Sequence, residues 1–408
     1  MNSFLFKIID ILLHFLPMNN NLVFFSSFED QYSDHPKAIS EKVHELYPDV
    51  LIVWPFSDRA KLDRVPEYVI KVKINSVRHA ILKNRAKVII DNYTGIYNVF
   101  TEKRNSWKYK LLIKKRQINF STWHGTPLKK IGRSMMNRGK DVFISTSSGF
   151  ILNSKYITEI LHREFDNTIP VHLLGSARND LLFEKDTDKL QRIKTHLGLD
   201  SKCQYVLYAP TFRYYDGFDS KPYSLYMSSE QIDMCIAALK SRFGGEWAFI
   251  IRVHQKIKEQ NTELFNGKTV INGNEHDDMA EYLAVCDILI TDFSGSLFDF
   301  ANTNKPCFLY APDFFHYKNK ERGLYLDVQK LPYTFTISDK ELVENILNYD
   351  SNEQITKVYE FNKYLGNIDD GKASERIAHL IYSSLTDDKL HFKRKQQKNV
   401  KKNKRINK

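Results

Sequence analysis

With 408 residues, of which 42% are hydrophobic and 13% are aromatic, the chain is too apolar for a disordered protein. It is also longer than a single hydrophobic core usually serves, so we expect two domains. The formal net charge of +11 is concentrated in residues 389–408, which contain ten Lys or Arg residues and no Asp or Glu.

The basic end of the chain, residues 387–408, is expected to be disordered and separate from both domains. The rest of the chain is nearly neutral, so this tail alone would attract a polyanion. Phe392 is its single aromatic residue, so the tail lacks the stacking residues with which proteins bind single-stranded nucleic acid. We therefore expect an anionic membrane surface, and no nucleic acid, as its partner.

Residues 1–18 predict an amphipathic N-terminal helix. Between Phe4 and Leu16 the polar residues Lys7, Asp10 and His14 fall on one helical face. Thirteen residues are too few to cross a bilayer, and a basic leader and a cleavage site are both missing, which excludes a signal peptide. Two interpretations stay open, namely a helix in the membrane interface and a helix packed on the first domain.

Residues 19–186 are expected to form an N-terminal α/β domain on the acceptor side. Short apolar runs alternate there with polar segments that suit helices, such as 35–46 and 75–82. Uninterrupted apolar runs are typical of parallel strands that are buried on both faces. The predicted strands are 22–25, 50–54, 68–70, 88–90, 118–120 and 142–144.

The stretch Ser121–Gly132, which reads S-T-W-H-G-T-P-L-K-K-I-G, follows one of these strands. We expect a loop and then a helix from Leu128, so this stretch would lie at the carboxyl edge of the sheet, where open α/β sheets bind ligands. His124 is its only side chain that titrates near neutrality, so proton transfer is available to it. The alternative is a histidine that only caps or packs the loop.

Residues 187–386 predict a second α/β domain that binds the donor. The expected helices are 189–197, 229–243 and 279–284, and the expected strands are 205–208, 247–253, 269–271, 288–290 and 307–310. Two such halves facing each other across a cleft make a GT-B architecture. No Gly-x-Gly-x-x-Gly motif follows a strand, which argues against a dinucleotide-binding fold.

Three patterns suggest phosphate binding. Arg252 and His254 are two residues apart at a strand end, so both side chains face the same way. The turn 291–296 combines hydroxyl groups with a glycine before a helix, and a simple N-cap is the compatible alternative. Arg178, at the boundary between the domains, could meet a phosphate or form a salt bridge with Asp180.

Four motifs carry a resemblance to a known family: W-H-G-T-P-L-K at 123–129, Y-A-P-T-F-R at 208–213, I-I-R-V-H at 250–254 and I-T-D-F-S-G-S-L-F-D-F at 290–300. In this order they resemble the CDP-glycerol glycerophosphotransferase family of teichoic acid polymerases and primases, over about residues 21–374. The family usually has proline at position 177, serine at 295 and proline at 255, where this chain has Ala177, Gly295 and Gln255.

The resemblance implies a GT-B fold and a site whose residues we assign by motif. His124 would be the general base for the acceptor hydroxyl, and His254 would stabilise the leaving CMP or hold a phosphoryl oxygen. The donor and its phosphates would contact Arg178, Arg213, Arg252, Thr291, Asp292, Ser294, Ser296 and Arg322. Supporting positions would be Trp123, Gly125, Thr126, Lys129, Thr211 and Asp299.

The implied reaction moves glycerol phosphate from CDP-glycerol to a hydroxyl of a lipid-linked or growing teichoic-acid-like or capsular polymer, with release of CMP. It would occur at the cytoplasmic face of the bacterial membrane. CDP-ribitol is the alternative donor. Two further functions stay open, namely a sugar-nucleotide glycosyltransferase and a non-enzymatic module that binds membranes or polyanions. No cofactor is expected, and no metal, because no Asp-x-Asp pair stands at a strand end and Arg and His could replace a cation.

Overall fold

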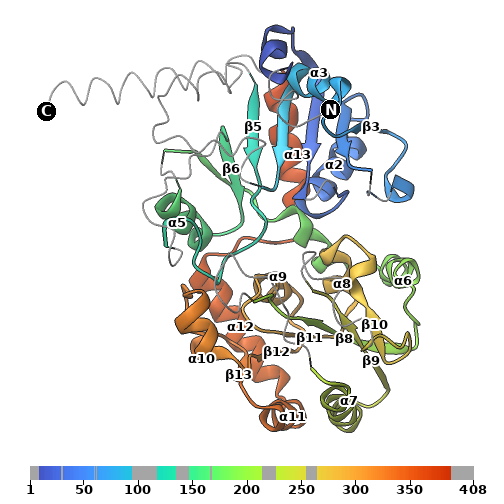
Figure 1. Ribbon diagram of the computed structural model, residues 1–408, viewed down its shortest axis with the longest axis vertical. Helices are drawn as coiled ribbons and strands as arrows, with labels where there is room; N and C mark the ends of the chain where they lie inside the picture. Colours follow the sequence, from blue (N-terminus) through green and yellow to red (C-terminus); the bar gives the residue numbers. More distant parts are fainter. Residues whose placement is uncertain are drawn as a thin grey trace, which may run out of the picture.

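The computed structural model describes residues 9–28, 31–58, 60, 62–93, 117–134, 147–165, 168–213, 227–253 and 264–386. Within these ranges the chain forms two lobes, each built on one parallel sheet, which lie one above the other in Figure 1. The two predicted α/β halves are therefore confirmed. The predicted strand 142–144, His254 and the basic tail 387–408 lie outside the described residues.

The first lobe contains a seven-stranded sheet with the strand order β3-β2-β1-β4-β5-β6-β7, in which all pairs are parallel. Alternate residues of β1 are buried in different apolar clusters, Val23 and Phe25 in one and Leu22 and Phe24 in another. Both faces of this strand are therefore covered, as the uninterrupted apolar run predicts. The strands are β1 (Asn19–Ser26), β2 (Leu51–Phe56), β3 (Val69–Lys73), β4 (Ala86–Asp91), β5 (Ile118–Ser121), β6 (Gly149–Leu152) and β7 (Val171–Leu173).

The second lobe contains a six-stranded parallel sheet with the order β10-β9-β8-β11-β12-β13. Its central strand β8 also faces two clusters, with Leu207 on one side and Val206 on the other. The strands are β8 (Cys203–Ala209), β9 (Glu246–Ile251), β10 (Val270–Asn272), β11 (Ile288–Thr291), β12 (Cys307–Tyr310) and β13 (Thr334–Thr336).

Helices cover the faces of both sheets (Figure 1). Their starts follow ordinary capping chemistry; for example, Ser228 and Gln231 form a reciprocal capping box at the start of α7. The α-helices are α2 (Asp34–Leu46), α3 (Val77–Arg85), α5 (Lys155–Glu164), α6 (Thr187–His196), α7 (Ser229–Phe243), α8 (Met279–Val285), α9 (Ser296–Phe300), α10 (Phe314–His316), α11 (Asp339–Leu347), α12 (Ser351–Leu365) and α13 (Ala373–Thr386).

The last helix, α13, returns to the first lobe. Its residues Ile377, Ala378 and Ile381 are buried in the same cluster as strands of the first sheet, and Figure 1 shows the helix beside those strands. The sequence places residues up to 386 in the second domain, so the structure differs there. Asp180 fixes the start of α13, because its carboxylate accepts hydrogen bonds from the N–H groups of Ala373 and Ser374 at 2.9 and 2.7 Å.

The described part of the N-terminal segment packs on the first lobe. Asp10 is buried against α3, where its carboxylate lies 2.9 Å from Nζ of Lys83 and accepts a 2.7 Å hydrogen bond from Asn84. Leu12 and Phe15 remain 66% and 92% exposed. The segment is therefore anchored by its polar face and presents apolar side chains to solvent. None of the helices in the described ranges has the length and hydropathy that a membrane span requires.

Candidate active site

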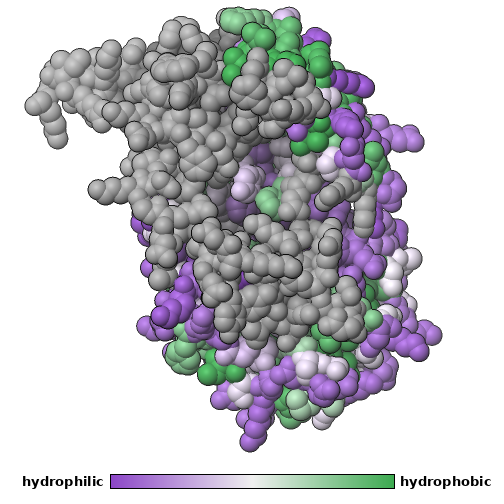
Figure 2. Space-filling view, viewed as in Figure 1, coloured by the Kyte–Doolittle hydropathy of each residue, from purple (hydrophilic) through white to green (hydrophobic). Residues whose placement is uncertain are grey.

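The carboxyl ends of central strands from both sheets meet at the boundary between the lobes. His124 follows β5 in the first lobe, and Asp292 follows β11 in the second. Contact here is close, because a Cβ atom on Gly295 would lie 2.8 Å from the carbonyl oxygen of Thr126. Figure 2 shows a hollow with mostly hydrophilic residues between the lobes. Ligands of open α/β sheets bind at such an edge.

The backbone around His124 adopts uncommon conformations. Trp123 has φ of +57° and Gly125 has φ of +127°. A positive φ is unfavourable for a residue as large as tryptophan, by about 1–3 kcal/mol, so the surroundings must impose it. Trp123 is buried against Phe165, with ring centroids 5.1 Å apart, and its ring stacks on His124 at 4.4 Å. Packing of the indole therefore fixes the backbone at Trp123 and, with it, the position of the next residue, His124.

The other end of this loop belongs to the second lobe. Leu128 is fully buried in the second-lobe core, together with Phe293 and Leu297. A short antiparallel bridge pairs Lys129 with Leu324 of the second lobe. The helix that the sequence predicts from Leu128 is therefore wrong, because the backbone there forms hydrogen bonds with the loop segment 322–325 instead of with its own next turn. The segment 322–325 therefore holds the end of the His124 loop.

Within the described part of the chain, the imidazole of His124 has one hydrogen bond. Its Nδ1 lies 3.1 Å from the backbone carbonyl oxygen of Asn92, at the end of β4. A carbonyl can only accept, so Nδ1 carries the proton and Nε2 keeps a lone pair. The residue is solvent-accessible but surrounded by protein, and this burial lowers its pKa, although the Asn92 bond and Asp34 oppose the shift. His124 is thus held neutral, in the form that can accept a proton.

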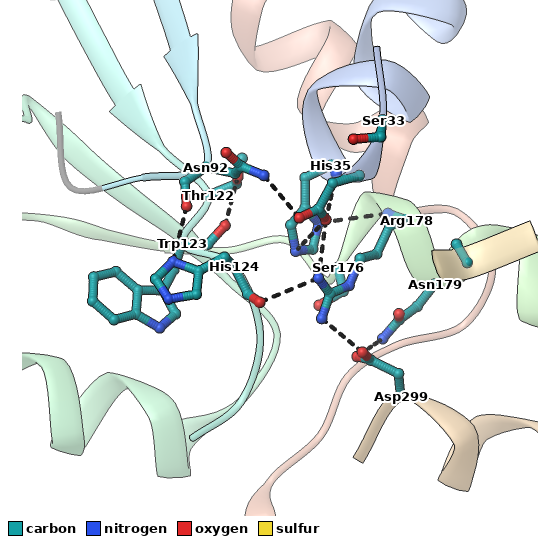
Figure 3. Close-up of polar contacts among 12 residues, drawn as sticks. Ser33, His35, Asn92, Thr122, Trp123, His124, Ser176, Arg178, Asn179 and Asp299 are labelled. Atoms are coloured by element: carbon teal, nitrogen blue, oxygen red, sulfur yellow. Dashed lines mark hydrogen bonds and ion pairs between the residues drawn. The ribbon is translucent and has the colours of Figure 1, made fainter. Parts of the chain in front are cut away.

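Arg178 joins the two lobes. Its guanidinium lies 3.0 Å from the Asp34 carboxylate in the first lobe and 2.6 Å from that of Asp299 in the second (Figure 3). It also donates to the carbonyl oxygen of His124 at 3.2 Å. The expected alternative, a salt bridge between Arg178 and Asp180, is not formed, because Asp180 caps α13. With two carboxylates and a carbonyl as partners, Arg178 holds the site together in this structure rather than presenting its charge to a phosphate.

Arg213 lies behind the site. Its side chain is 1% exposed, is 2.8 Å from Asp292 and 2.6 Å from Asp313, and stacks on the rings of Phe293 and Tyr317. Asp292 in turn accepts from the backbone N–H of Thr211 at 2.9 Å. The sequence assigns Arg213 to the donor phosphates, but in the structure its guanidinium is buried and already paired with two carboxylates.

Thr291 and Arg252 also serve the protein framework. The hydroxyl of Thr291 is buried and donates to the carbonyl oxygen of Ala209 at 2.7 Å. Arg252 donates to the carbonyl oxygens of Gly273 and Asp277 at 2.6 and 2.8 Å, and also to that of His276. These bonds shape the loop 273–277. The predicted joint contact of Arg252 with His254 stays untested, since His254 lies outside the described residues.

Lys129 and Arg322 lie between the lobes near His124. The ammonium of Lys129 is 3.5 Å from the hydroxyl of Thr211, across the lobe boundary. Burial, together with Arg322 and Arg213, lowers the pKa of Lys129 to about 7 against the opposing effect of Asp292. Nε of Arg322 donates to the carbonyl oxygen of Lys130 at 2.8 Å, and the charge of Arg322 also lowers the pKa of His124. Three cationic side chains, Lys129, Arg213 and Arg322, are therefore close enough to affect one another here.

The serine turn adjoins these cations. Oγ of Ser294 accepts hydrogen bonds from the backbone N–H of Ser296 at 3.3 Å and from its hydroxyl at 3.0 Å. The N-cap of α9 is Gly295, which makes no side-chain cap, so neither serine is the cap that the simple alternative predicts. Gly295, found where the family usually has serine, is explained by the contact with Thr126, because a side chain there would press on the opposite lobe.

Sequence reasoning missed three residues of this site: Asp34, His35 and Asn92. Asn92 directly follows β4, and this position was an available signal, whereas Asp34 and His35 begin α2, several residues after β1. Burial lowers the pKa of His35 to about 3, with Arg178 and His124 acting in the same direction and Asp34 against it. No group of three or more His, Cys, Asp or Glu side chains in the described ranges could hold a metal ion.

Comparison with known proteins shows which proteins this chain resembles. The chain is 29% identical over 391 residues to a teichoic acid poly(glycerol phosphate) polymerase of Bacillus spizizenii, covering 91% of this chain and 94% of the relative. It is 24% identical over 402 residues to a teichoic acid ribitol-phosphate primase of the same organism, covering 91% and 93%.

Solved structures of the wall teichoic acid polymerase TagF have the same fold. One is a histidine variant soaked with CDPG, with a TM-score of 0.75 and 26% identity over 93% of this chain and 92% of that one. The GT-B architecture expected from the sequence is thus confirmed. Residues 8–383 match the profile of the family described as CDP-Glycerol:Poly(glycerophosphate) glycerophosphotransferase. The chain therefore belongs to the CDP-glycerol:poly(glycerophosphate) glycerophosphotransferase family.

Proposed function

We propose that this enzyme transfers glycerol phosphate from CDP-glycerol to a hydroxyl of a lipid-linked or growing teichoic-acid-like or capsular polymer. The observation that supports this most is the state of His124. A neutral imidazole at the lobe boundary, with its Nδ1 proton bound to the carbonyl oxygen of Asn92, leaves Nε2 able to take a proton from an acceptor hydroxyl. Family membership supplies the class of donor.

The proposed reaction is an in-line displacement at the β-phosphorus of the donor. The acceptor oxygen forms a bond to phosphorus while His124 takes its proton. The bond from phosphorus to the bridging oxygen breaks, and CMP leaves with that oxygen. Lys129 and Arg322, with the hydroxyls of Ser294 and Ser296, would stabilise charge on the transferring group, which is the main source of rate in phosphoryl transfer.

The three arginines of the site would act indirectly, without contacting the reacting groups. Arg178, Arg213 and Arg252 are occupied by carboxylates or carbonyls, so we propose that they hold the loops that carry the reacting groups. Asp292 and Asp299 would hold Arg213 and Arg178 in place. Thr291 would serve the framework through its hydrogen bond to Ala209. His254 keeps its proposed role at the leaving group.

The reaction is tested by incubating the protein with CDP-glycerol and a lipid-linked acceptor and measuring CMP. We expect His124→Ala to lower turnover by about 10²- to 10⁴-fold with little change in donor binding. His379→Ala, at a half-exposed histidine on α13, is the matched control and should keep full turnover. Unchanged turnover in His124→Ala would remove this residue from the mechanism, and release of a nucleoside diphosphate would indicate glycosyl transfer.

CDP-ribitol is a second possible donor. The similarity to a ribitol-phosphate primase covers nearly the whole chain and supports it, although the identity is lower than to the glycerol-phosphate polymerase. The same assay with CDP-ribitol decides between them. A ratio of kcat/KM above about tenfold, equivalent to about 1.4 kcal/mol of transition-state binding, would identify the preferred donor.

We propose that the enzyme works at the cytoplasmic face of the membrane as a peripheral protein. The exposed side chains of Leu12 and Phe15 and the basic residues 389–408 support this, since stable anchoring usually needs both an apolar and an electrostatic contribution. Deletion of residues 389–408 should reduce sedimentation with phosphatidylglycerol vesicles and leave turnover on a soluble acceptor unchanged. A full-length protein that binds these vesicles through the tail but shows no turnover on any acceptor would favour a non-enzymatic binding function.

A further inference from the structure

We infer that Asp34 is the positioning residue that sets both the orientation and the tautomer of His124. This inference rests on the proposed function, in which His124 is the general base. Asp34 does not contact the imidazole through a hydrogen bond. Asp34 binds the two residues that do hold His124, namely Asn92 and Arg178.

The first connection runs through Asn92. Oδ2 of Asp34 accepts a 2.7 Å hydrogen bond from the side-chain amide of Asn92, and the amide oxygen of Asn92 accepts from the backbone N–H of Phe28 at 3.0 Å. The amide of Asn92 is thereby fixed in one orientation. Its backbone carbonyl is the group that accepts from Nδ1 of His124. The place of this carbonyl, and hence the tautomer of His124, depends on the Asp34 contact.

The second connection runs through Arg178. Oδ1 of Asp34 accepts from Nη1 of Arg178 at 3.0 Å, and the same Nη1 donates to the carbonyl oxygen of His124 at 3.2 Å. Asp34 therefore fixes the ring of His124 through Asn92 and its backbone through Arg178. Arg178 continues to Asp299 at 2.6 Å, so this support extends into the second lobe.

The backbone and the charge of Asp34 both suit this role. Asp34 has φ of +64°, which is uncommon outside glycine, although Asp and Asn adopt it more readily than other residues. Its Oδ1 also accepts from the backbone N–H of His35 at 2.7 Å. Burial alone would raise the pKa of Asp34, but Arg178 and His35 lower it below its ordinary value. The carboxylate is therefore charged while it serves three donors.

Only a carboxylate can satisfy these donors, which makes a sharp test possible. In Asp34→Asn the side chain keeps its size and tolerates the positive φ, but it has one acceptor oxygen instead of two. If that oxygen stays with Arg178, the new amide faces the amide of Asn92, donor against donor. The ring support is then lost without a large change in shape. Asn92→Ala is the second variant, because it removes the side-chain tie and keeps the backbone carbonyl.

The kinetic test combines these variants with His124→Ala. We expect Asp34→Asn and Asn92→Ala to lower kcat by about 10- to 100-fold, with the KM for CDP-glycerol changed by less than about twofold, as expected for a misplaced base. In a background that already carries His124→Ala, the same changes should lower kcat by less than about threefold further, because the group they position is absent. The control is Glu281→Gln, which breaks a 3.0 Å ion pair with Lys37 between the lobes but does not touch this network.

The second test needs no substrate. The nitrogen chemical shifts of His124 in protein labelled with ¹⁵N-histidine should show Nδ1 protonated in the wild type and a mixture of both tautomers in Asp34→Asn. If the wild type releases no CMP from any CDP-alditol, the proposed function fails but this measurement still decides the role of Asp34. Unchanged His124 shifts in a folded Asp34→Asn protein would overturn the inference, as would an equal loss of kcat with and without His124.

Discussion

Trp123 and Leu128 are close in sequence but are buried in the cores of different lobes, Trp123 with Phe165 in the first and Leu128 with Phe293 in the second. The segment between them contains His124, Gly125, Thr126 and Pro127. The position of the proposed base is therefore defined by two hydrophobic anchors, and packing that is remote from the chemistry should affect the rate.

Leu128→Ala should lower both stability and turnover. Removing a fully buried leucine side chain costs about 2–5 kcal/mol through lost burial and the cavity that remains. Because Leu128 also fixes the loop, kcat should fall further than the loss of folded protein explains. The measurements are urea unfolding and kcat on the folded fraction.

Two further variants separate these effects. Leu347→Ala makes the same chemical change at a residue that is 40% exposed, and it should cost clearly less stability and leave kcat unchanged. Leu128→Met keeps most of the volume and should restore most of kcat. A Leu128→Ala protein with normal kcat would show that the second anchor does not position His124.

Gly125→Ala should impair catalysis for two reasons. Its φ of +127° is a conformation that residues with a side chain rarely adopt, at a cost of about 1–3 kcal/mol. A Cβ atom there would also lie 2.7 Å from Nη2 of Arg178, so the guanidinium would have to move away from its two carboxylates. We expect a lower melting temperature and a fall in kcat.

Gly198→Ala is the matched control for this prediction. Gly198 has φ of +70°, but a Cβ atom there would meet nothing within 4 Å. The variant should therefore show the backbone cost alone, about 1–2 kcal/mol, with unchanged kcat. If both variants show the same loss in the free energy of unfolding and neither shows a lower kcat, the close approach of Gly125 to Arg178 does not contribute to catalysis.

Much of this fold could be predicted from the sequence. The runs 22–25, 205–208 and 288–290 form buried parallel strands as expected, because a strand covered on both faces needs apolar residues at every position. The loop with His124 also lies at the predicted edge. Whether a residue directly follows a strand depends only on the neighbouring sequence, so the hydrophobic pattern predicts it well.

The hydrophobic pattern could not predict contacts between residues that are far apart in the sequence. The chain shows an arginine at position 178, but nothing local reveals that Asp34 and Asp299, from opposite lobes, occupy its guanidinium. In the same way, residues 128–131 have the composition of a helix start, yet their partner is the segment 322–325. The return of α13 to the first lobe has the same origin, since its apolar face fits either sheet until the three-dimensional arrangement is known.

Arg213→Met should destabilise the protein more than it weakens donor binding. The guanidinium is buried and paired with Asp292 and Asp313, so its removal leaves two carboxylates without their cation, at a cost of about 3–5 kcal/mol. The measurements are urea unfolding and the KM for CDP-glycerol. If Arg213 instead contacts the donor phosphates, KM will rise while stability changes little.

The KM for the donor should depend on pH through Lys129. The pKa of this lysine is lowered to about 7, so it is an ammonium below that pH and increasingly a neutral amine above it. The charged form attracts the pyrophosphate of the donor, and a bound anion would in turn raise the pKa of the lysine. The KM for CDP-glycerol should therefore rise as pH increases from about 6 to about 8, and kcat at saturating donor should change less.

Lys129→Arg tests this cause directly, because arginine stays charged throughout that range. The variant should show a KM that is independent of pH between about 6 and 8, whereas Lys130→Arg, one residue further along, should keep the wild-type profile. Donor binding measured by calorimetry in buffers of different ionisation enthalpy should also show proton uptake at pH 8 in the wild type and none in Lys129→Arg. The same pH dependence in both proteins would place the titrating group elsewhere, since a permanently charged side chain at position 129 cannot produce it.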